Sequence, residues 1–546
     1  MIRGPRVGLS AVVALGVSAA AISCARTESQ PAPSSSVPQV RQVAYLKASN
    51  PDMGDHFACG GSLPGHIGSA LAVSADGNTM VVGAPHESSN ARGINGNAAD
   101  NSLYNSGAVY VFVRRNGAWV QQAYVKASNA GQSNLFGMSV AVSADGNTLA
   151  VSAPWEPSAA TGVNGNQNDT SMPQAGAAYV FVRSGESWSQ QAYVKASNTG
   201  HPADLDDPTA DGDQFGSSIA LSGDGNTLAV GAITEDSVAT GINGNAADDS
   251  ANSAGAVYVY SRTGTSWAQQ AYVKGSNTEA ADLFGYDVAL SHDGNTLVAA
   301  GYDEDGPGRG VNVADQGNGA NGSGALYVFN RAGGAWKQDA YLKGSRSEGN
   351  DALGFSIAIS ADGNTIIGGA ADESCLLGGI SPQGCNTDKP EDASGGSAGA
   401  AYVWVRGNGT WTEQAFIKSS SPQLQDWFAA NLALSADGNT LLVAAPMEDS
   451  RARGIDGDQK DDSAVESGAA YVFRRTGTSW AQLAYMKASN AEEYDEFGTA
   501  VAVTGDGRTL VTGARMESGG VAGVNGNEND NSMPQSGAVY VWEVSQ

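Results

Sequence analysis

The sequence predicts an all-β fold in which seven four-stranded units close into a ring, a seven-bladed β-propeller. Three observations predict it: a Ser-x-Asp-Gly-Asn-Thr turn recurs seven times, the same order of short apolar runs surrounds each copy, and no useful length has helical periodicity. Repeated four-stranded units without helices are typical of propellers. Glycine, at 72 of 546 residues, suits a chain with many turns.

The turn fixes the repeat. Its aspartates are Asp76, Asp145, Asp224, Asp293, Asp362, Asp437 and Asp506. An Asp-Gly pair between alternating apolar residues is a strong signal for a β-hairpin. Each turn therefore predicts the first two strands of one blade.

The second repeat shows the whole unit. Strands are expected over residues 136–142 and 149–153, on either side of the Asp-Gly turn. After a long polar loop, residues 177–181 and 188–195 predict a second hairpin rich in aromatic and β-branched residues.

The two ends of the chain predict how the ring closes. The third-strand motif ends the series at residues 539–542, whereas the first fourth-strand motif, residues 44–47, precedes the first turn. The N-terminal strand is therefore expected to complete the last blade, which leaves few unpaired edges.

The first residues read as a targeting segment. Arg3 and Arg6 precede an apolar run, and Ala21-Ile22-Ser23-Cys24 resembles the lipobox of bacterial lipoproteins. This resemblance implies a signal peptide over residues 1–23 and a lipid on Cys24. The alternative is an ordinary signal peptide that is cut near Ala20.

The predicted domain order follows from composition. Residues 24–42 are rich in Ser, Pro and Gln and predict a flexible, lipid-anchored linker, followed by the propeller over residues 43–546. No later stretch has the roughly 18 apolar residues of a membrane span. We expect a protein of the cell envelope, at the outer membrane or cell surface, that contacts the membrane only through its lipid.

The charge balance excludes some partners. Asp and Glu number 56 against 29 Lys and Arg, a net charge of −27. Nucleic acid needs a basic surface, and anionic lipid attracts basic segments, so neither is expected.

Two short motifs carry a family resemblance. Phe-Gly begins repeats at Phe136, Phe215, Phe284 and Phe497, and is degraded at Ile67-Gly68, Leu353-Gly354 and Phe428-Ala429. Together with Gly-Ala-Pro, as at residues 83–85, this resembles the FG-GAP repeat of integrin α chains and many bacterial surface proteins, over residues 43–546. The resemblance implies a propeller whose long-loop face binds partners.

The resemblance also implies calcium in the first hairpin loop of a blade. Calcium needs six to eight oxygen ligands. The Ser-x-Asp-Gly-Asn-Thr turn is too short to supply them, so we expect no calcium there.

Acidic and amide residues mark the long loops. A glutamate lies 11 residues after every turn aspartate, and five loops then carry Gly-(Ile/Val)-(Asn/Asp)-Gly-(Asn/Asp). The candidate binding residues are Glu87, Asn95, Asn97, Asp100, Glu156, Asn164, Asn166, Asp169, Glu235, Asn243, Asn245, Asp248, Glu448, Asp456, Asp458, Asp461, Glu517, Asn525, Asn527 and Asp530. The favoured alternative is that Asn and Asp cap turns and that the glutamate braces its loop.

If calcium binds anywhere, the most acidic loop is the expected place, through Glu448, Asp456, Asp458 and Asp461. The sequence indicates no cofactor other than such a calcium ion.

Two further residue types recur in register. One lysine in each repeat falls on the outermost strand. The favoured interpretation is that these lysines protect edge strands from aggregation, and the alternative is a ring that binds anions. The lysines are Lys47, Lys126, Lys195, Lys274, Lys343, Lys418 and Lys487. A tryptophan begins the fourth strand in six repeats. The favoured interpretation is that these side chains pack between blades, and the alternative is that they stack against sugars. The tryptophans are Trp119, Trp188, Trp267, Trp336, Trp411 and Trp480.

Cysteine and histidine are few. Cys375 and Cys385 bracket the aberrant loop of blade 5 and predict a disulfide in an exported protein, which leaves Cys59 unpaired. The five histidines show no metal-binding spacing in the sequence.

These features favour a monomeric, non-catalytic binding or adhesion module whose partner is an extracellular or envelope protein or a glycan. The alternatives are an enzyme that acts on polysaccharide, with the loop carboxylates Asp388, Glu391 and Asp392 as candidates, and a structural component of an envelope complex.

Overall fold

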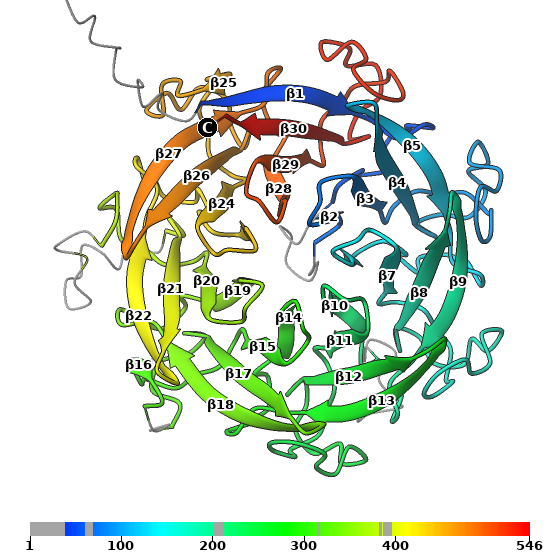
Figure 1. Cartoon of the computed structure of the whole chain (residues 1–546), viewed down its shortest axis with the longest axis vertical. Coiled ribbons are helices and arrows are strands. Elements are labelled where there is room, and N and C mark those ends of the chain that lie inside the picture. The colour runs from blue at the N-terminus through cyan, green and yellow to red at the C-terminus, as the bar shows by residue number, and fades with distance from the viewer. Residues whose placement is uncertain are drawn as a thin grey trace, which may run out of the picture. The chain divides into compact units, whose positions relative to one another are not determined.

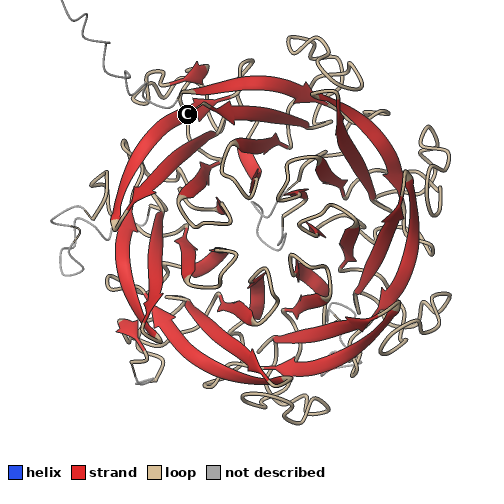
Figure 2. Cartoon of the chain, viewed as in Figure 1, coloured by secondary structure: helices blue, strands red, loops and turns tan. Residues whose placement is uncertain are grey.

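Seven antiparallel sheets stand around one axis in the computed structural model of the chain (Figure 1). The structure describes residues 39–59, 69–200, 212–313, 317–381, 385 and 396–545. Within these ranges every regular element is a strand (Figure 2), and no helix that could cross a membrane occurs there. The sequence-based prediction of a seven-bladed β-propeller is confirmed.

Each blade runs from a short inner strand at the axis to a long outer strand. Blade 1 holds β2 (Leu71–Val73), β3 (Thr79–Ala84), β4 (Ala108–Arg115) and β5 (Ala118–Val125). Blade 2 holds β6 (Val140–Val142), β7 (Thr148–Ala153), β8 (Ala177–Ser184) and β9 (Ser187–Val194). Blade 3 holds β10 (Phe215–Leu221), β11 (Thr227–Ala232), β12 (Ala256–Thr263) and β13 (Ser266–Val273).

Blades 4 and 6 each carry a fifth, two-residue strand. Blade 4 holds β14 (Phe284–Leu290), β15 (Thr296–Gly301), β16 (Gly310–Val311), β17 (Ala325–Ala332) and β18 (Ala335–Lys343). Blade 5 holds β19 (Leu353–Ile359), β20 (Thr365–Ala370), β21 (Ala400–Gly407) and β22 (Thr410–Ile417). Blade 6 holds β23 (Asn431–Leu434), β24 (Thr440–Ala445), β25 (Gly454–Ile455), β26 (Ala469–Thr476) and β27 (Ser479–Lys487). Blade 7 holds β28 (Phe497–Val503), β29 (Thr509–Ala514), β30 (Ala538–Val544) and β1 (Val40–Leu46).

The N-terminal strand closes the ring, as predicted. β1 pairs antiparallel with β30, from Val40 opposite Val544 to Leu46 opposite Val539. The predicted boundary at residue 43 is wrong, because β1 begins inside the predicted linker. Val40 belongs to the sheet since its side chain is buried in the same core cluster as Trp542.

The hairpin turns behave as the sequence predicts. In blade 2 the Ser143 hydroxyl donates to Asp145 over 2.6 Å, and the Asn147 backbone N–H donates to the same carboxylate over 3.0 Å. Gly146 supplies the positive φ, 69°, that the turn requires. The carboxylate is therefore occupied by its own turn.

The turns also bond to one another. In each turn, one backbone N–H donates to a backbone carbonyl of the next turn. The donor is the first or second residue after the Ser or Thr that begins the turn; Ala144, for example, donates to Gly223 over 2.9 Å. The series runs through all seven blades and returns from Gly505 to Ala75 over 3.0 Å. These bonds tie the blades together at one rim of the ring.

At the other rim, the Phe-Gly positions join neighbouring repeats, because the Phe136 backbone N–H donates to the Ser106 carbonyl of blade 1 over 3.3 Å. Phe136 packs edge-on against Tyr179, with ring centroids 5.3 Å apart, and the Gly137 N–H donates to Ser152 over 2.9 Å. In blade 1 this place belongs to Phe57, whose ring lies 5.4 Å from Tyr110. The assignment to Ile67-Gly68 is therefore wrong; those two residues lie outside the described ranges.

The tryptophans pack between blades, as favoured. Trp188 is buried, and its indole Nε1 donates over 2.9 Å to Gln122 of the preceding blade. Gln122 sits in the register shift between β4 and β5, and such a bulge turns its side chain out of the ladder toward the neighbour. The Arg183 guanidinium covers the same indole at 5.4 Å.

Cys375 and Cys385 form the predicted disulfide, and Cys59 is buried with a free thiol. The bond holds together the aberrant loop of blade 5. Asp388, Glu391 and Asp392 of that loop lie outside the described residues.

Candidate functional site

The loop glutamates are not on the surface, and their prediction as partner-binding residues is wrong. Glu87 is 1% exposed, and its carboxylate lies 2.7 Å from the Lys126 ammonium, which is completely buried. Every blade repeats this buried pair. The pairs are Glu87–Lys126, Glu156–Lys195, Glu235–Lys274, Glu304–Lys343, Glu373–Lys418, Glu448–Lys487 and Glu517–Lys47.

The reading of the lysines as edge protection is wrong for the same reason. Burial lowers the pKa of Lys126, and the facing Glu87 opposes that shift. The long loop explains the burial, because Ile94 forms a β-bridge with Val125 and lays the loop against the outer strand. The corresponding contacts elsewhere involve Val163, Ile242, Val311, Ile380, Ile455 and Val524.

Polar neighbours complete each pair. In blade 1 the Tyr124 hydroxyl donates to Glu87 over 2.8 Å, and the Lys126 ammonium also donates to the Ser106 hydroxyl over 2.7 Å. A buried ion pair is stable only when its remaining hydrogen-bonding capacity is met. The glutamates thus brace the blades, as the alternative reading held.

The loop amides and aspartates form the loop's own structure. Asn95 has a φ of 55°, and its side-chain oxygen accepts the Tyr124 N–H over 2.9 Å. The same bond is made by Asn164, Asn243, Asp456 and Asn525 to Tyr193, Tyr272, Tyr485 and Tyr45. Side-chain oxygens of Asn97, Asn166, Asn245, Asp458 and Asn527 accept the N–H two residues on.

The last candidate aspartate of each of these five loops, Asp100 in blade 1, closes a wider turn. The Asp100 carboxylate accepts the N–H groups of Asn90 and Ser102 over 3.2 and 2.9 Å. Asp169, Asp248, Asp461 and Asp530 hold the equivalent turns.

The calcium site that was expected in the most acidic loop, if calcium binds anywhere, is not formed. Glu448 is paired with Lys487, and Asp456 bonds the backbone of Tyr485. The acidic loop of blade 6 does not bring three ligand atoms together; in the described part of the chain, the metal-compatible cluster of three or more ligands is formed by His56, Cys59 and His86.

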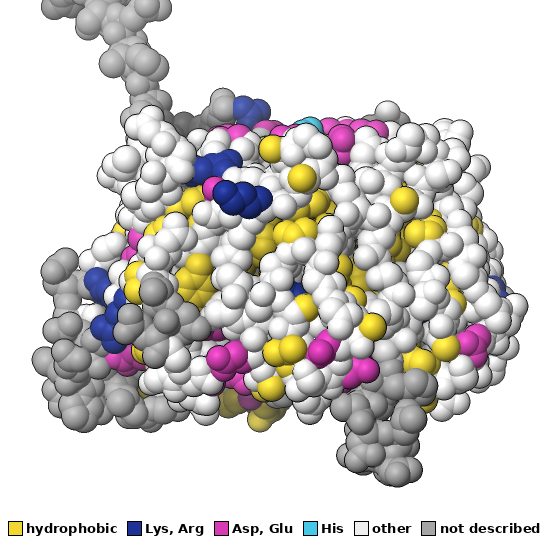
Figure 3. All heavy atoms as spheres, turned by 90° about the horizontal axis from the view of Figure 1, so that it is seen from below, with side chains coloured by type: hydrophobic (Ala, Val, Ile, Leu, Met, Phe, Trp, Pro, Cys, Tyr) yellow, Lys and Arg dark blue, Asp and Glu magenta, His cyan; other side chains and the backbone are white. Residues whose placement is uncertain are grey.

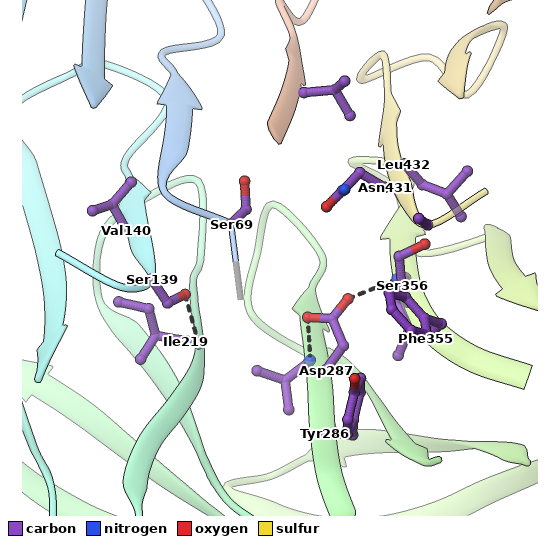
Figure 4. A pocket seen from close by; sticks show the side chains of 14 residues that line it. Ser69, Ser139, Val140, Ile219, Tyr286, Asp287, Phe355, Ser356, Asn431 and Leu432 are labelled. Carbon is purple, nitrogen blue, oxygen red and sulfur yellow. Dashed lines mark hydrogen bonds between the residues drawn. The ribbon is translucent and has the colours of Figure 1, made fainter. Parts of the chain in front are cut away.

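The central channel holds a cavity of about 140 Å³ to which all seven blades contribute (Figure 4). Aliphatic side chains form about half of its wall, among them Val140, Ile219 and Leu432. Hydroxyl and amide groups of Ser69, Ser139 and Asn431 enter it as polar points.

Asp287 is the charged residue of the cavity wall. Its carboxylate accepts two backbone N–H groups, from Val288 over 2.9 Å and from Ile357 of the next blade over 2.7 Å. Burial raises the pKa of Asp287 to about 7. Both oxygens are engaged, one by its own strand β14 and one by β19 of the next blade, which gives this carboxyl a structural task.

An aromatic group stands at the cavity on blades 4 to 6. The rings of Tyr286 and Tyr302 stack 4.2 Å apart at 14°. Phe355 lies 5.8 and 5.9 Å from these two rings, and Trp427 lies 6.0 Å from Phe355. Tyr302, Phe355 and Trp427 remain partly exposed, and burial raises the pKa of the neighbouring Asp372.

The repeat pattern in the sequence does not reveal this aromatic group. The positions of Tyr286 and Phe355 are filled in blades 2, 3, 6 and 7 by Met138, Ser217, Ala430 and Thr499. Tyr286 and Phe355 share one repeat position, but no position of the group is aromatic in every blade, so only this departure from the repeat could have marked the four residues.

The surface carries the acidic balance. On the side of the ring drawn in Figure 3, acidic side chains gather toward both rims and apolar ones lie between them. Since the seven repeat lysines are internal, they add no positive charge to the surface.

Comparison with known proteins identifies the repeat. The FG-GAP repeat matches residues 119–181 and 480–542. The chain therefore carries FG-GAP repeats in a seven-bladed propeller, consistent with an integrin α-like FG-GAP propeller.

Two solved structures are among those to which the chain is similar at low sequence identity. One is a 6-phosphogluconolactonase candidate from Bacteroides uniformis, at 10% identity over 77% of this chain and 85% of that chain, with a TM-score of 0.41. The other is the WD40 repeats of RRP9, at 9% identity over 93% of this chain and 100% of that chain, with a TM-score of 0.46. No curated protein matches the chain.

The buried pair predicts a large effect for one substitution. Lys126→Met leaves the Glu87 carboxylate buried without its cation, and we expect the free energy of unfolding to fall by about 3–5 kcal/mol. Denaturant unfolding measures it. The control is Arg115→Ala, because its pair with Glu186 is exposed and contributes less than about 1 kcal/mol. Equal effects of the two substitutions would contradict the structural role.

A set of buried aspartates predicts a pH dependence. Asp55, Asp213, Asp282, Asp426 and Asp495 each lie two residues before a Phe position and accept a backbone N–H. Burial raises the pKa of the first three and of Asp495 to about 7, and that of Asp426 to about 8. Blade 2 has Asn134 at this place.

Because these folded-state pKa values lie above the ordinary value of 3.8, the folded chain binds more protons than the unfolded chain up to about pH 7. Stability is therefore expected to fall as pH rises, with a higher melting temperature at about pH 5 than at about pH 8. Asp282→Asn/Asp426→Asn should reduce the difference. An unchanged pH profile in that double variant would refute the assignment.

Proposed function

We propose that the chain is a non-catalytic binding module of the cell envelope that takes a glycan at the aromatic side of the central cavity. The observation that carries the proposal is the interrupted repeat at Tyr286, Tyr302, Phe355 and Trp427. Aromatic side chains that serve only the core recur in register, whereas these four lie at positions that most other blades fill with non-aromatic residues. Three of them, Tyr302, Phe355 and Trp427, are partly exposed.

The chemistry of the place suits a sugar. Partly exposed aromatic rings offer flat apolar faces to the C–H face of a sugar ring, and a few polar groups beside them fix its orientation. Ser69, Ser139 and Asn431 offer such groups in the adjoining cavity. Since protein cavities of about 150 Å³ hold a six-membered ring such as benzene, the cavity of about 140 Å³ admits a group of about that size rather than a folded partner.

The hydrogen bonds and ion pairs of the carboxyl groups favour a binding role over catalysis. The Asp287 oxygens accept backbone N–H groups, and the seven loop glutamates face buried lysines. These arrangements position the scaffold and supply no acid and base pair across the cavity. A protein partner bound to the long loops stays the alternative.

Glycan arrays probed with the full chain test this role. We expect binding that Phe355→Ala and Trp427→Ala each weaken at least about tenfold, the scale of one lost aromatic contact. Tyr104→Ala is the control, because Tyr104 is 65% exposed on an outer loop. Absence of binding across a broad panel, or binding that neither substitution weakens, would count against a glycan site.

The proposed anchoring has a separate test. Residues 1–38 lie outside the described ranges, so the proposal rests on the lipobox-like residues 21–24. In bacterial cells, labelled palmitate should enter the natural chain and not Cys24→Ala. Equal labelling of both would show that Cys24 is not the lipidated residue.

A further inference from the structure

Three side chains that bind metals in other proteins meet at the rim where blade 1 begins. His56, Cys59 and His86 place one ligand atom each within 4.8 Å of one another. The two imidazole rings have centroids 4.7 Å apart. The chain has five histidines and four cysteines, and Cys375 and Cys385 are joined to each other.

The repeat shows that this meeting is particular to one blade. At the place of His56, directly before the Phe position, the other blades carry Leu135, Gln214, Leu283, Ala352, Trp427 and Glu496. At the place of Cys59 they carry Met138, Ser217, Tyr286, Phe355, Ala430 and Thr499. At the place of His86 they carry Trp155, Thr234, Asp303, Asp372, Met447 and Met516.

The scaffold does not require these residue types. Each of the three positions accepts apolar and polar residues elsewhere in the ring, so packing alone explains none of the substitutions. Three separate departures from the repeat converge on one point in space, and all three introduce a nitrogen or sulfur ligand.

A cation lies beside the buried Cys59 side chain. Cys59 is completely buried, and Arg515 lies beside it, held by Glu496 through two bonds of 2.6 and 2.9 Å. Burial raises the pKa of the Cys59 thiol, and the Arg515 guanidinium opposes that shift. His56 and His86 are half-buried, which leaves a path from solvent to the cluster.

We propose that His56, Cys59 and His86 bind a divalent transition-metal ion of the zinc class. Two imidazoles and one thiolate are a set that zinc and its neighbours prefer over the oxygen ligands of calcium. Tetrahedral bonds of about 2.0–2.3 Å place ligand atoms roughly 3.3–3.8 Å apart, so small rotations of the three side chains complete the site. The fourth position is left to water or to a group of a bound partner.

This site is independent of the proposed glycan site. It lies on blade 1, with its supporting Arg515 and Glu496 on blade 7, whereas the aromatic group lies on blades 4 to 6. Loss of metal should leave glycan binding by Phe355 and Trp427 unchanged.

Cobalt titration of the full chain tests the site. In a Cys24→Ser background, Cys59 is the sole thiol. We expect one Co²⁺ per chain, with a sulfur-to-cobalt charge-transfer band in the near ultraviolet that Zn²⁺ abolishes on displacing the cobalt. Zn²⁺ should also raise the melting temperature, because the ion binds the folded chain.

Substitutions separate a built site from adventitious binding. Cys59→Ser should remove the charge-transfer band, and His86→Ala should weaken the affinity at least about tenfold. The matched control is His292→Ala, since His292 is exposed in a hairpin turn at the other rim. Circular dichroism checks that each variant is folded.

Two results would overturn the proposal. One is a natural-sequence chain that shows no sulfur-to-cobalt band and no zinc-dependent rise in melting temperature. The other is a folded Cys59→Ser variant that retains the band.

Discussion

A buried lysine–glutamate pair fixes the width of every blade. The glutamate follows the second strand and the lysine ends the fourth, so one ion pair spans the sheet from its inner half to its outer edge. Removing these charges from water is costly unless each meets the other, which makes the pair an all-or-none constraint. In blade 7 the partners Lys47 and Glu517 come from opposite parts of the chain, so the same constraint also sets the register of ring closure.

Features that repeat in register could be predicted from the sequence. The number of blades, the hairpin turns, the closing strand and the packing of the tryptophans all follow from periodic residues with a local physical meaning. The lysines were misread because a charged residue on an outer strand normally faces water. That inference failed where Ile94 and its counterparts fold the long loop against the strand, a contact that sequence spacing does not reveal.

The candidate sites escaped prediction for the opposite reason. Tyr286, Phe355 and Trp427 are far apart in sequence and meet only because consecutive blades bring neighbouring positions of the repeat to one channel. His56, Cys59 and His86 likewise converge through the fold. In a repeat protein, periodic residues describe the scaffold, and function is more readily sought among residues that break the period.

Closure by β1 also determines the order of assembly. Arg41 and Glu543 face each other across the β1–β30 pair although 502 residues separate them in sequence. A growing chain therefore presents its first strand long before the partner strand exists, and blades 1 to 6 can form while the last blade cannot. Until synthesis is complete, the edge that β1 will cover is absent and β1 itself is an unpaired strand. The nascent protein must be kept from pairing that strand elsewhere.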